Sequence, residues 1–235
     1  MNKVSLFITL ALLAPTFAQA KTHHRKNHHR GSYSGRRSCR GNVDYALFFG
    51  QCMSPLVLQL DPGQRKPEEI ALTRQTDGVL FDLLGWRTGR DGGKQRISWF
   101  TAESVRTNYL LALPASDGSI NGIDELFGNN TAGPDGTFAD NGYEALRKWD
   151  ANQDGVIDAR DAVFAKLRLW SDTNLNGVVE AEELHTLAEL NVESISLLYD
   201  SIVVKTDESG NQIALPSTVQ TTDGIHHVMY DIWFR

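Results

Sequence analysis

The sequence lacks the short motifs that mark several common catalytic sites. It contains no G-x-S-x-G nucleophile elbow, no H-E-x-x-H zinc motif and no phosphate-binding P-loop. These absences argue against enzymes of the corresponding classes. We therefore expect a protein without enzymatic activity and keep a secreted hydrolase only as a less favoured alternative.

Cysteine is scarce, because Cys39 and Cys52 are the only two in the 235 residues. An oxidising compartment would allow this pair to form a disulfide bond. Two buried free thiols are the alternative interpretation. We favour the disulfide, since the N-terminal residues predict export.

Long apolar runs are absent after residue 20. The first residues combine a positive charge at Lys3, an apolar run from Val4 to Phe17 and an A-x-A cleavage site at 18–20. This combination is typical of a secretory signal peptide, whereas a membrane-spanning helix needs about 20 apolar residues. We expect a signal peptide over residues 1–20, a secreted or periplasmic location and no membrane span.

Acidic residues are missing from the first forty residues, although the net charge of the whole chain is −6. Residues 21–40 combine Lys and Arg with four histidines and show no apolar periodicity, so we expect a disordered tail there. Metal binding by the histidines and binding of a polyanion are the alternatives to a solvated tail. Specific nucleic-acid recognition is disfavoured because the tail has few aromatic residues. Residues 41–235 are predicted to form one domain.

Two acidic stretches of twelve residues dominate that domain. Loop 1, D-A-N-Q-D-G-V-I-D-A-R-D, runs from Asp150 to Asp161, and loop 2, D-T-N-L-N-G-V-V-E-A-E-E, runs from Asp172 to Glu183. Each has oxygen-bearing side chains at positions 1, 3, 5, 9 and 12 and a glycine at position 6, which is the pattern of an EF-hand calcium loop. Including the carbonyl oxygen at position 7, the expected ligands are Asp150, Asn152, Asp154, Val156, Asp158 and Asp161 in loop 1, and Asp172, Asn174, Asn176, Val178, Glu180 and Glu183 in loop 2.

The last ligand predicts a difference between the two calcium sites. Loop 1 ends in Asp161, whose short side chain reaches an ion in bidentate fashion less readily than the Glu183 side chain that ends loop 2. We therefore expect loop 2 to be the more calcium-selective and loop 1 to accept magnesium as well.

A third turn, around Gly118, resembles a decayed loop, but its positions 1 and 3 are apolar and we expect an ordinary turn. Its remaining oxygen-bearing residues are Asp117, Asn121, Asp124 and Glu125.

Apolar periodicity predicts helices around the loops and strands on either side of them. Tyr143, Leu146 and Trp149 indicate a helix that leads into loop 1, and the stretches Arg160–Trp170 and Ala181–Leu190 are predicted to be helical. A ribbon between 156–157 and 178–179 would join the loops. The expected fold is α+β, with short β-strands and hairpins flanking a compact helical EF-hand pair (140–190) that shares one central helix. C-terminal β-hairpins are expected over 193–235.

The order of these features resembles a module of large bacterial secreted calcium-binding proteins of the RTX and haemolysin type. The matching segments are S-P-L-V-L-Q-L-D at 54–61, D-G-V-L-F-D-L at 77–83, I-N-G-I-D-E-L-F-G-N-N-T at 120–131 and D-I-W-F at 231–234, together with the two loops. The resemblance implies an EF-hand module in which both loops ligate calcium, and it implies no enzymatic activity. Glycine-rich nonapeptide repeats are absent, so a calcium β-roll is not implied.

These observations predict an exported, non-enzymatic protein in which two calcium ions stabilise or order the fold. The alternative is a dockerin-like module that binds a partner protein or a cell-surface partner once calcium has ordered its helices. A dockerin needs similar recognition residues after each loop. The sequences after the two loops differ, 162–163 being Ala-Val and 184–185 Leu-His, which favours the first interpretation.

Overall fold

The computed structural model describes residues 54–60, 70–83, 85 and 93–235, all within the compact unit Ser38–Arg235. The predicted signal peptide, the His-rich tail and the Cys39–Cys52 pair lie outside the described residues. Within the described ranges, no helix is long and apolar enough to cross a membrane.

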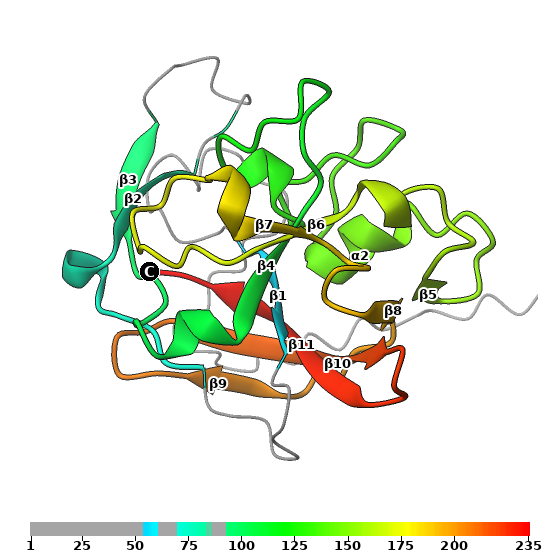
Figure 1. Ribbon diagram of the computed structural model, residues 1–235. Helices are drawn as coiled ribbons and strands as arrows, with labels where there is room; N and C mark the ends of the chain where they lie inside the picture. The colour runs from blue at the N-terminus through cyan, green and yellow to red at the C-terminus, as the bar shows by residue number, and fades with distance from the viewer. Residues whose placement is uncertain (1–53, 61–69, 84, 86–92) are drawn as a thin grey trace, which may run out of the picture. The chain divides into compact units, whose positions relative to one another are not determined.

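A nine-stranded antiparallel sheet forms the framework of this unit (Figure 1). Eight strands follow the order β5-β8-β10-β11-β1-β4-β6-β7, and β9 pairs with one end of β10. The central pairs join strands that are distant in the sequence, since β1 pairs with both β11 and β4. The strands are β1 (Leu56–Gln59), β4 (Asn108–Ala112), β5 (Val156–Ile157), β6 (Arg168–Trp170), β7 (Leu184–Thr186), β8 (Val192–Ser196), β9 (Val204–Thr206), β10 (Gln212–Thr221) and β11 (His226–Trp233).

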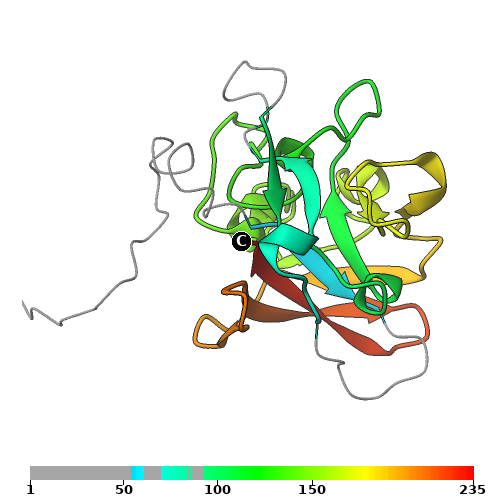
Figure 2. The same cartoon turned by 90° about the vertical axis from the view of Figure 1, so that its left-hand side faces the viewer.

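The remaining elements are short. A separate two-stranded sheet consists of β2 (Val79–Asp82) and β3 (Lys94–Ile97), and the single α-helix of the described residues is α2 (Gly142–Arg147). Turns of 3-10 helix lie at Gln75–Asp77, Ser104–Arg106, Ile123–Glu125, Phe164–Lys166 and Ala181–Glu183 in the part of the chain that the structure describes. Figure 2 shows the β2–β3 hairpin and the long β10–β11 pair from a second direction.

Alternation of side chains along the central strands divides the core into two clusters. In β1, Val57 belongs to one cluster, while its neighbours Leu56 and Leu58 belong to the other. In β4, Leu110 and Leu111 are divided in the same way. Successive residues of a strand point to opposite faces of the sheet, so each cluster covers one face. The β2–β3 hairpin contributes to the first cluster and α2 to the second.

Helix α2 is held in place by its first turn. The side chain of Asn141 caps the helix by accepting a hydrogen bond from the Glu144 amide at 2.9 Å. The Gly142 amide donates to the carboxyl group of Asp231 on β11 at 2.9 Å, and the Tyr143 hydroxyl donates to the Met229 carbonyl at 2.7 Å. These bonds fix the segment that leads into loop 1 against the centre of the main sheet.

The predicted α+β fold with a helical EF-hand pair is wrong, because the described residues are mainly β. The stretch predicted as the shared central helix contains one 3-10 turn followed by β6, and the stretch after loop 2 contains a 3-10 turn followed by β7. The apolar residues at 167, 169 and 170 are fully buried because β6 pairs with β4. Tertiary pairing with β4 has thus overridden a local spacing that also fits a helix.

The predicted ribbon between the two loops is also absent. β5, at positions 7 and 8 of loop 1, pairs with Ser196 and Ile195 of β8 instead of with residues 178–179. Residues 178–179 belong to no strand, and the Val178 side chain is exposed. Each loop is therefore attached to a different part of the main sheet.

Candidate cation-binding loops

Loop 2 closes the hairpin formed by β6 and β7. Trp170 pairs with Leu184, and the Ser171 amide donates to the Glu183 carbonyl at 3.1 Å, so the two ends of the loop meet at the mouth of the hairpin. The side chains at positions 1 and 12, Asp172 and Glu183, are consequently brought to the same place. In this fold the β6–β7 hairpin brings the ends of loop 2 together, whereas two flanking helices are expected in an EF-hand.

Both end carboxylates of loop 2 are buried and surrounded by N–H donors. Asp172, 1% exposed, accepts from the Gly177 amide at 2.8 Å and from the Trp99 indole at 2.7 Å. Glu183, 2% exposed, accepts from the Thr173 amide at 2.8 Å and from the Trp170 indole at 3.2 Å. The two indole rings are in contact, with centroids 5.6 Å apart. Loop 2 is therefore anchored to the aromatic part of the core.

Burial affects the two carboxyl groups differently. It raises the pKa of Asp172, against the hydrogen bonds from Gly177, Asn176 and Trp99 that lower it, and the nearby charge of Glu183 raises it further. Burial also acts to raise the pKa of Glu183, but hydrogen bonds from groups that include the Trp170 indole and the Thr173 hydroxyl outweigh it and leave that pKa lowered. The loop thus holds negative charge in a place that water reaches poorly.

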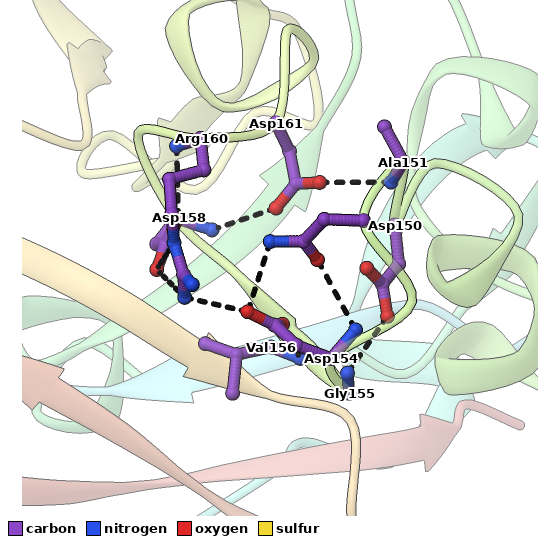
Figure 3. Close-up of polar contacts among 9 residues, drawn as sticks. Asp150, Ala151, Asp154, Gly155, Val156, Asp158, Arg160 and Asp161 are labelled. Atoms are coloured by element: carbon purple, nitrogen blue, oxygen red, sulfur yellow. Dashed lines mark hydrogen bonds and ion pairs between the residues drawn. The ribbon is translucent and has the colours of Figure 1, made fainter.

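Loop 1 has the same internal hydrogen bonds (Figure 3). Asp150 at position 1 accepts from the Gly155 amide at 2.9 Å, as Asp172 accepts from Gly177. Asp161 at position 12 accepts from the Ala151 amide at 2.8 Å, as Glu183 accepts from Thr173. Asp150 and Asp161 are 8% and 2% exposed, so the end carboxylates are buried in this loop as well.

The backbones of the two loops correspond in detail. The glycines at position 6, Gly155 and Gly177, have φ angles of 82° and 70°. The non-glycine residues at position 4, Gln153 and Leu175, also have positive φ angles, 59° and 61°. A positive φ is uncommon outside glycine, so its occurrence at the same two positions shows one shared loop conformation. The twelve-residue pattern has therefore folded as a recurrent loop without its predicted helices.

The side chains at positions 3, 5 and 9 form contacts near the surface. In loop 2, the amide groups of Asn174 and Asn176 donate to the two carboxylate oxygens of Glu180 at 3.4 and 2.8 Å. In loop 1, the Asn152 amide group donates to Asp154 at 2.9 Å. The backbone amides of Val156 and Val178 at position 7 donate to the side chains at position 5 of their own loops.

Arg160, at position 11 of loop 1, provides a positive charge at the loop surface. Its Nη2 lies 2.6 Å from a carboxylate oxygen of Asp154 and 2.6 Å from one of Asp158 (Figure 3). These hydrogen bonds from Arg160 lower the pKa of Asp158. Positions 5 and 9 of loop 1 are thus bridged by a side chain of the loop itself.

The prediction of an EF-hand metal-binding group is not supported by the described residues. In that part of the chain, no three His, Cys, Asp or Glu side chains are grouped closely enough to hold a metal ion as they stand. The end carboxylates instead bond to backbone amides, and the outer side chains bond to one another or to Arg160.

The third acidic turn does not bring its predicted residues together around one point. Asp117 accepts from Ser119, Glu125 accepts from the amides of Asn121 and Gly122, and Asp124 accepts from the Asn130 side chain at 2.8 Å. Hydrogen bonds from Ser119 lower the pKa of Asp117. These contacts are those of a turn followed by a 3-10 helix, as expected for a turn without the position 1 and 3 ligands.

No sequence motif indicates the two tryptophans that contact loop 2. Trp99 is 73 residues away from Asp172 in the sequence, so no local pattern connects them. Trp170 stands two residues before the loop, at the end of the stretch Arg160–Trp170 that apolar periodicity predicts to be helical. Arg160, in contrast, was visible inside loop 1, where a basic residue at position 11 signals a competitor for the acidic side chains.

Comparison with known proteins finds a matching family and a curated relative. The SPM domain family matches residues 56–235. The iron-regulated protein FrpA of Neisseria meningitidis serogroup C is 36% identical over 178 residues, which are 76% of this chain and 15% of that protein. This chain therefore spans only a small part of the length of that relative. The matching family is the SPM domain, and the assignment of the chain to an EF-hand family is wrong.

Proposed function

We propose that this chain, which belongs to the SPM domain family, is an exported, non-enzymatic protein that binds calcium through loops 1 and 2. Calcium would neutralise the carboxylates of each loop and hold its two ends together. The ion would thereby stabilise the hairpin of β6 and β7 at one place and the connection from α2 to β5 at the other.

The observation that carries this proposal is the pair of buried carboxylates in loop 2. Among the described residues, neither Asp172 nor Glu183 forms an ion pair with a Lys or Arg side chain. Moving a charge out of water costs several kcal/mol, and hydrogen bonds from neutral N–H groups offset this cost only in part. A divalent cation between the two carboxylates would remove the remaining penalty.

Loop 1 provides a second, independent observation. The Oδ1 atom of Asp150 is buried and has no hydrogen-bond partner, whereas its Oδ2 atom accepts from Gly155. Buried polar atoms without partners are rare in folded proteins and require an explanation. An ion at the centre of the loop would supply the missing partner for this oxygen.

The chemistry of the available groups suits calcium. All twelve predicted ligands offer oxygen atoms, which are the ligands that calcium and magnesium prefer, and none offers sulfur or an imidazole nitrogen. Calcium accepts irregular geometry and about six to eight ligands, whereas magnesium demands near-octahedral geometry. Loop 2, which ends in Glu183, is proposed to select calcium, and loop 1, which ends in Asp161, to accept magnesium as well.

Thermal melting of the protein tests the proposal. With a dissociation constant near 10⁻⁴ M, addition of 10 mM calcium stabilises the fold by roughly 2.7 kcal/mol per site. Each such contribution raises the melting temperature by roughly 5 to 10 °C for a domain of this size. We expect that rise relative to a sample with chelator, and a smaller rise with magnesium. Equal melting temperatures in calcium and in chelator would contradict the proposal.

A further inference from the structure

The two loops differ at position 11 more than at any ligand position. Loop 1 has Arg160 there, and loop 2 has Glu182. Arg160 forms ion pairs of 2.6 Å with Asp154 and with Asp158, whereas Glu182 is exposed and forms no ion pair with another described residue. The loops thus share a backbone conformation, but only loop 1 contains its own positive charge.

The guanidinium group occupies the oxygens that a calcium ion would need. The Arg160 Nε lies 3.0 Å from each of the two Asp158 oxygens, and its Nη2 bridges from Asp158 to Asp154. Asp154 and Asp158 are the side chains at positions 5 and 9 of loop 1. Calcium ligation at about 2.3–2.6 Å by the Asp158 oxygens or by Asp154 Oδ2 therefore competes with the guanidinium group for the same atoms, whereas Asp154 Oδ1 accepts from the Val156 amide.

Arg160 can leave without disturbing the core. Its side chain is 62% exposed, and its guanidinium group forms ion pairs with Asp154 and Asp158 and with no other carboxylate of the described residues. The end carboxylates of the loop, Asp150 and Asp161, bond to backbone amides and do not depend on Arg160. Displacement of the arginine would therefore open the outer half of the loop and leave the inner half in place.

We propose that Arg160 is a built-in competitor for the cation of loop 1, so that the two loops bind calcium in sequence, loop 2 first and loop 1 second. This inference rests on the proposed calcium binding and adds to it the order of binding. The arginine gives loop 1 a charge-neutralising partner at low calcium concentration. Calcium then binds loop 1 only at concentrations high enough to displace the guanidinium group.

Calcium titration calorimetry of the Arg160→Gln variant tests the inference. To observe loop 1 alone, the substitution is made in a full-length chain that also carries Asp172→Asn, which disables loop 2. Loss of two exposed ion pairs should tighten calcium binding at loop 1 by roughly three- to thirtyfold. Arg160→Lys, which retains the charge but not the planar fork, should give an affinity between the two. Arg74→Gln is the matched control, since it removes an exposed arginine that is paired with Asp77 outside the loops.

The outcomes separate this inference from the function on which it rests. Calcium binding at two sites in the unsubstituted chain, with the affinity of loop 1 unchanged or weakened by Arg160→Gln in the Asp172→Asn chain, would overturn the competition by Arg160 and leave the proposed function standing. An equal gain in affinity from Arg74→Gln would also overturn it, because net charge alone would then explain the effect. Absence of binding in every variant, including the unsubstituted chain, would instead refute the proposed function.

Discussion

The Asp172→Asn variant is expected to lose one of two bound calcium ions and to bind the other with little change. Asp172 is the first ligand of loop 2, and its carboxylate accepts from Gly177, Asn176 and Trp99. The variant removes the negative charge and replaces one acceptor oxygen by an amide nitrogen, which cannot accept from Gly177 and Trp99 at Oδ2 or from Asn176 at Oδ1. Loss of a buried charged ligand typically costs about 2–4 kcal/mol, so affinity at loop 2 should fall by roughly thirty- to thousandfold.

Calorimetric titration of calcium measures both the stoichiometry and the affinity in this variant. Asp200→Asn is the control, because Asp200 is exposed, lies outside both loops and accepts from the Ile202 amide at 2.8 Å. It makes the same change in charge without altering a proposed ligand. A stoichiometry of two in both variants would show that Asp172 is not a calcium ligand.

The Asp231→Asn variant is expected to remove a large pH dependence from the stability of the calcium-free protein. Asp231 is fully buried on β11, and burial raises the pKa of its carboxyl group from 3.8 to about 7, although the hydrogen bond from Gly142 lowers it. Because the folded-state pKa is the higher one, the folded protein binds the extra proton between these values, and its stability falls as the pH rises through them. The fall amounts to roughly 4 kcal/mol at about 1.36 kcal/mol per pKa unit.

Denaturant unfolding in the presence of chelator, between pH 4 and pH 8, measures this effect. Asparagine retains an acceptor for the Gly142 amide and carries no charge, so its stability relative to the unsubstituted chain should rise with pH and level off above about pH 7. The difference between the two chains isolates Asp231, since other carboxyl groups titrate in both. A difference that stays constant from pH 4 to pH 8 would show that Asp231 ionises with an ordinary pKa.

The loops could be predicted from the sequence because their conformation is local. Glycine at position 6 and an acceptor side chain at position 1 are enough to form the bond between Gly155 and Asp150, and the same pair recurs in Gly177 and Asp172. These contacts span five residues each. Short-range hydrogen bonds of side chains to backbone amides depend little on the rest of the fold.

The surroundings of the loops could not be predicted because they depend on distant strands. The apolar spacing of residues 163–170 fits a helix, but Leu169 and Trp170 pair with Leu111 and Leu110 of β4, about sixty residues earlier in the chain. The stretch after loop 2 turns back onto β6 in the same way. Apolar periodicity predicts helices on both sides of loop 2, whereas a hairpin brings the ends of the loop together.

The contacts that anchor loop 2 to the core also could not be predicted from the sequence. Trp99 reaches Asp172 because the segment that follows β3 packs in the cluster of aromatic rings that also contains Trp170 and Phe81. No spacing rule relates these residues. The same contacts suggest an intrinsic reporter, since an ion at loop 2 would change the electrostatic surroundings of two buried indole rings.

Calcium titration calorimetry of the full-length, unsubstituted chain tests the central claim most directly. The account predicts binding at two sites of different affinity, with the tighter site absent from Asp172→Asn and the weaker site strengthened by Arg160→Gln. Calcium is added to a chelator-treated sample up to several millimolar. If the only heat released is that of chelation, the account is contradicted. Both loops would then be stable turns whose buried carboxylates are held by N–H donors alone.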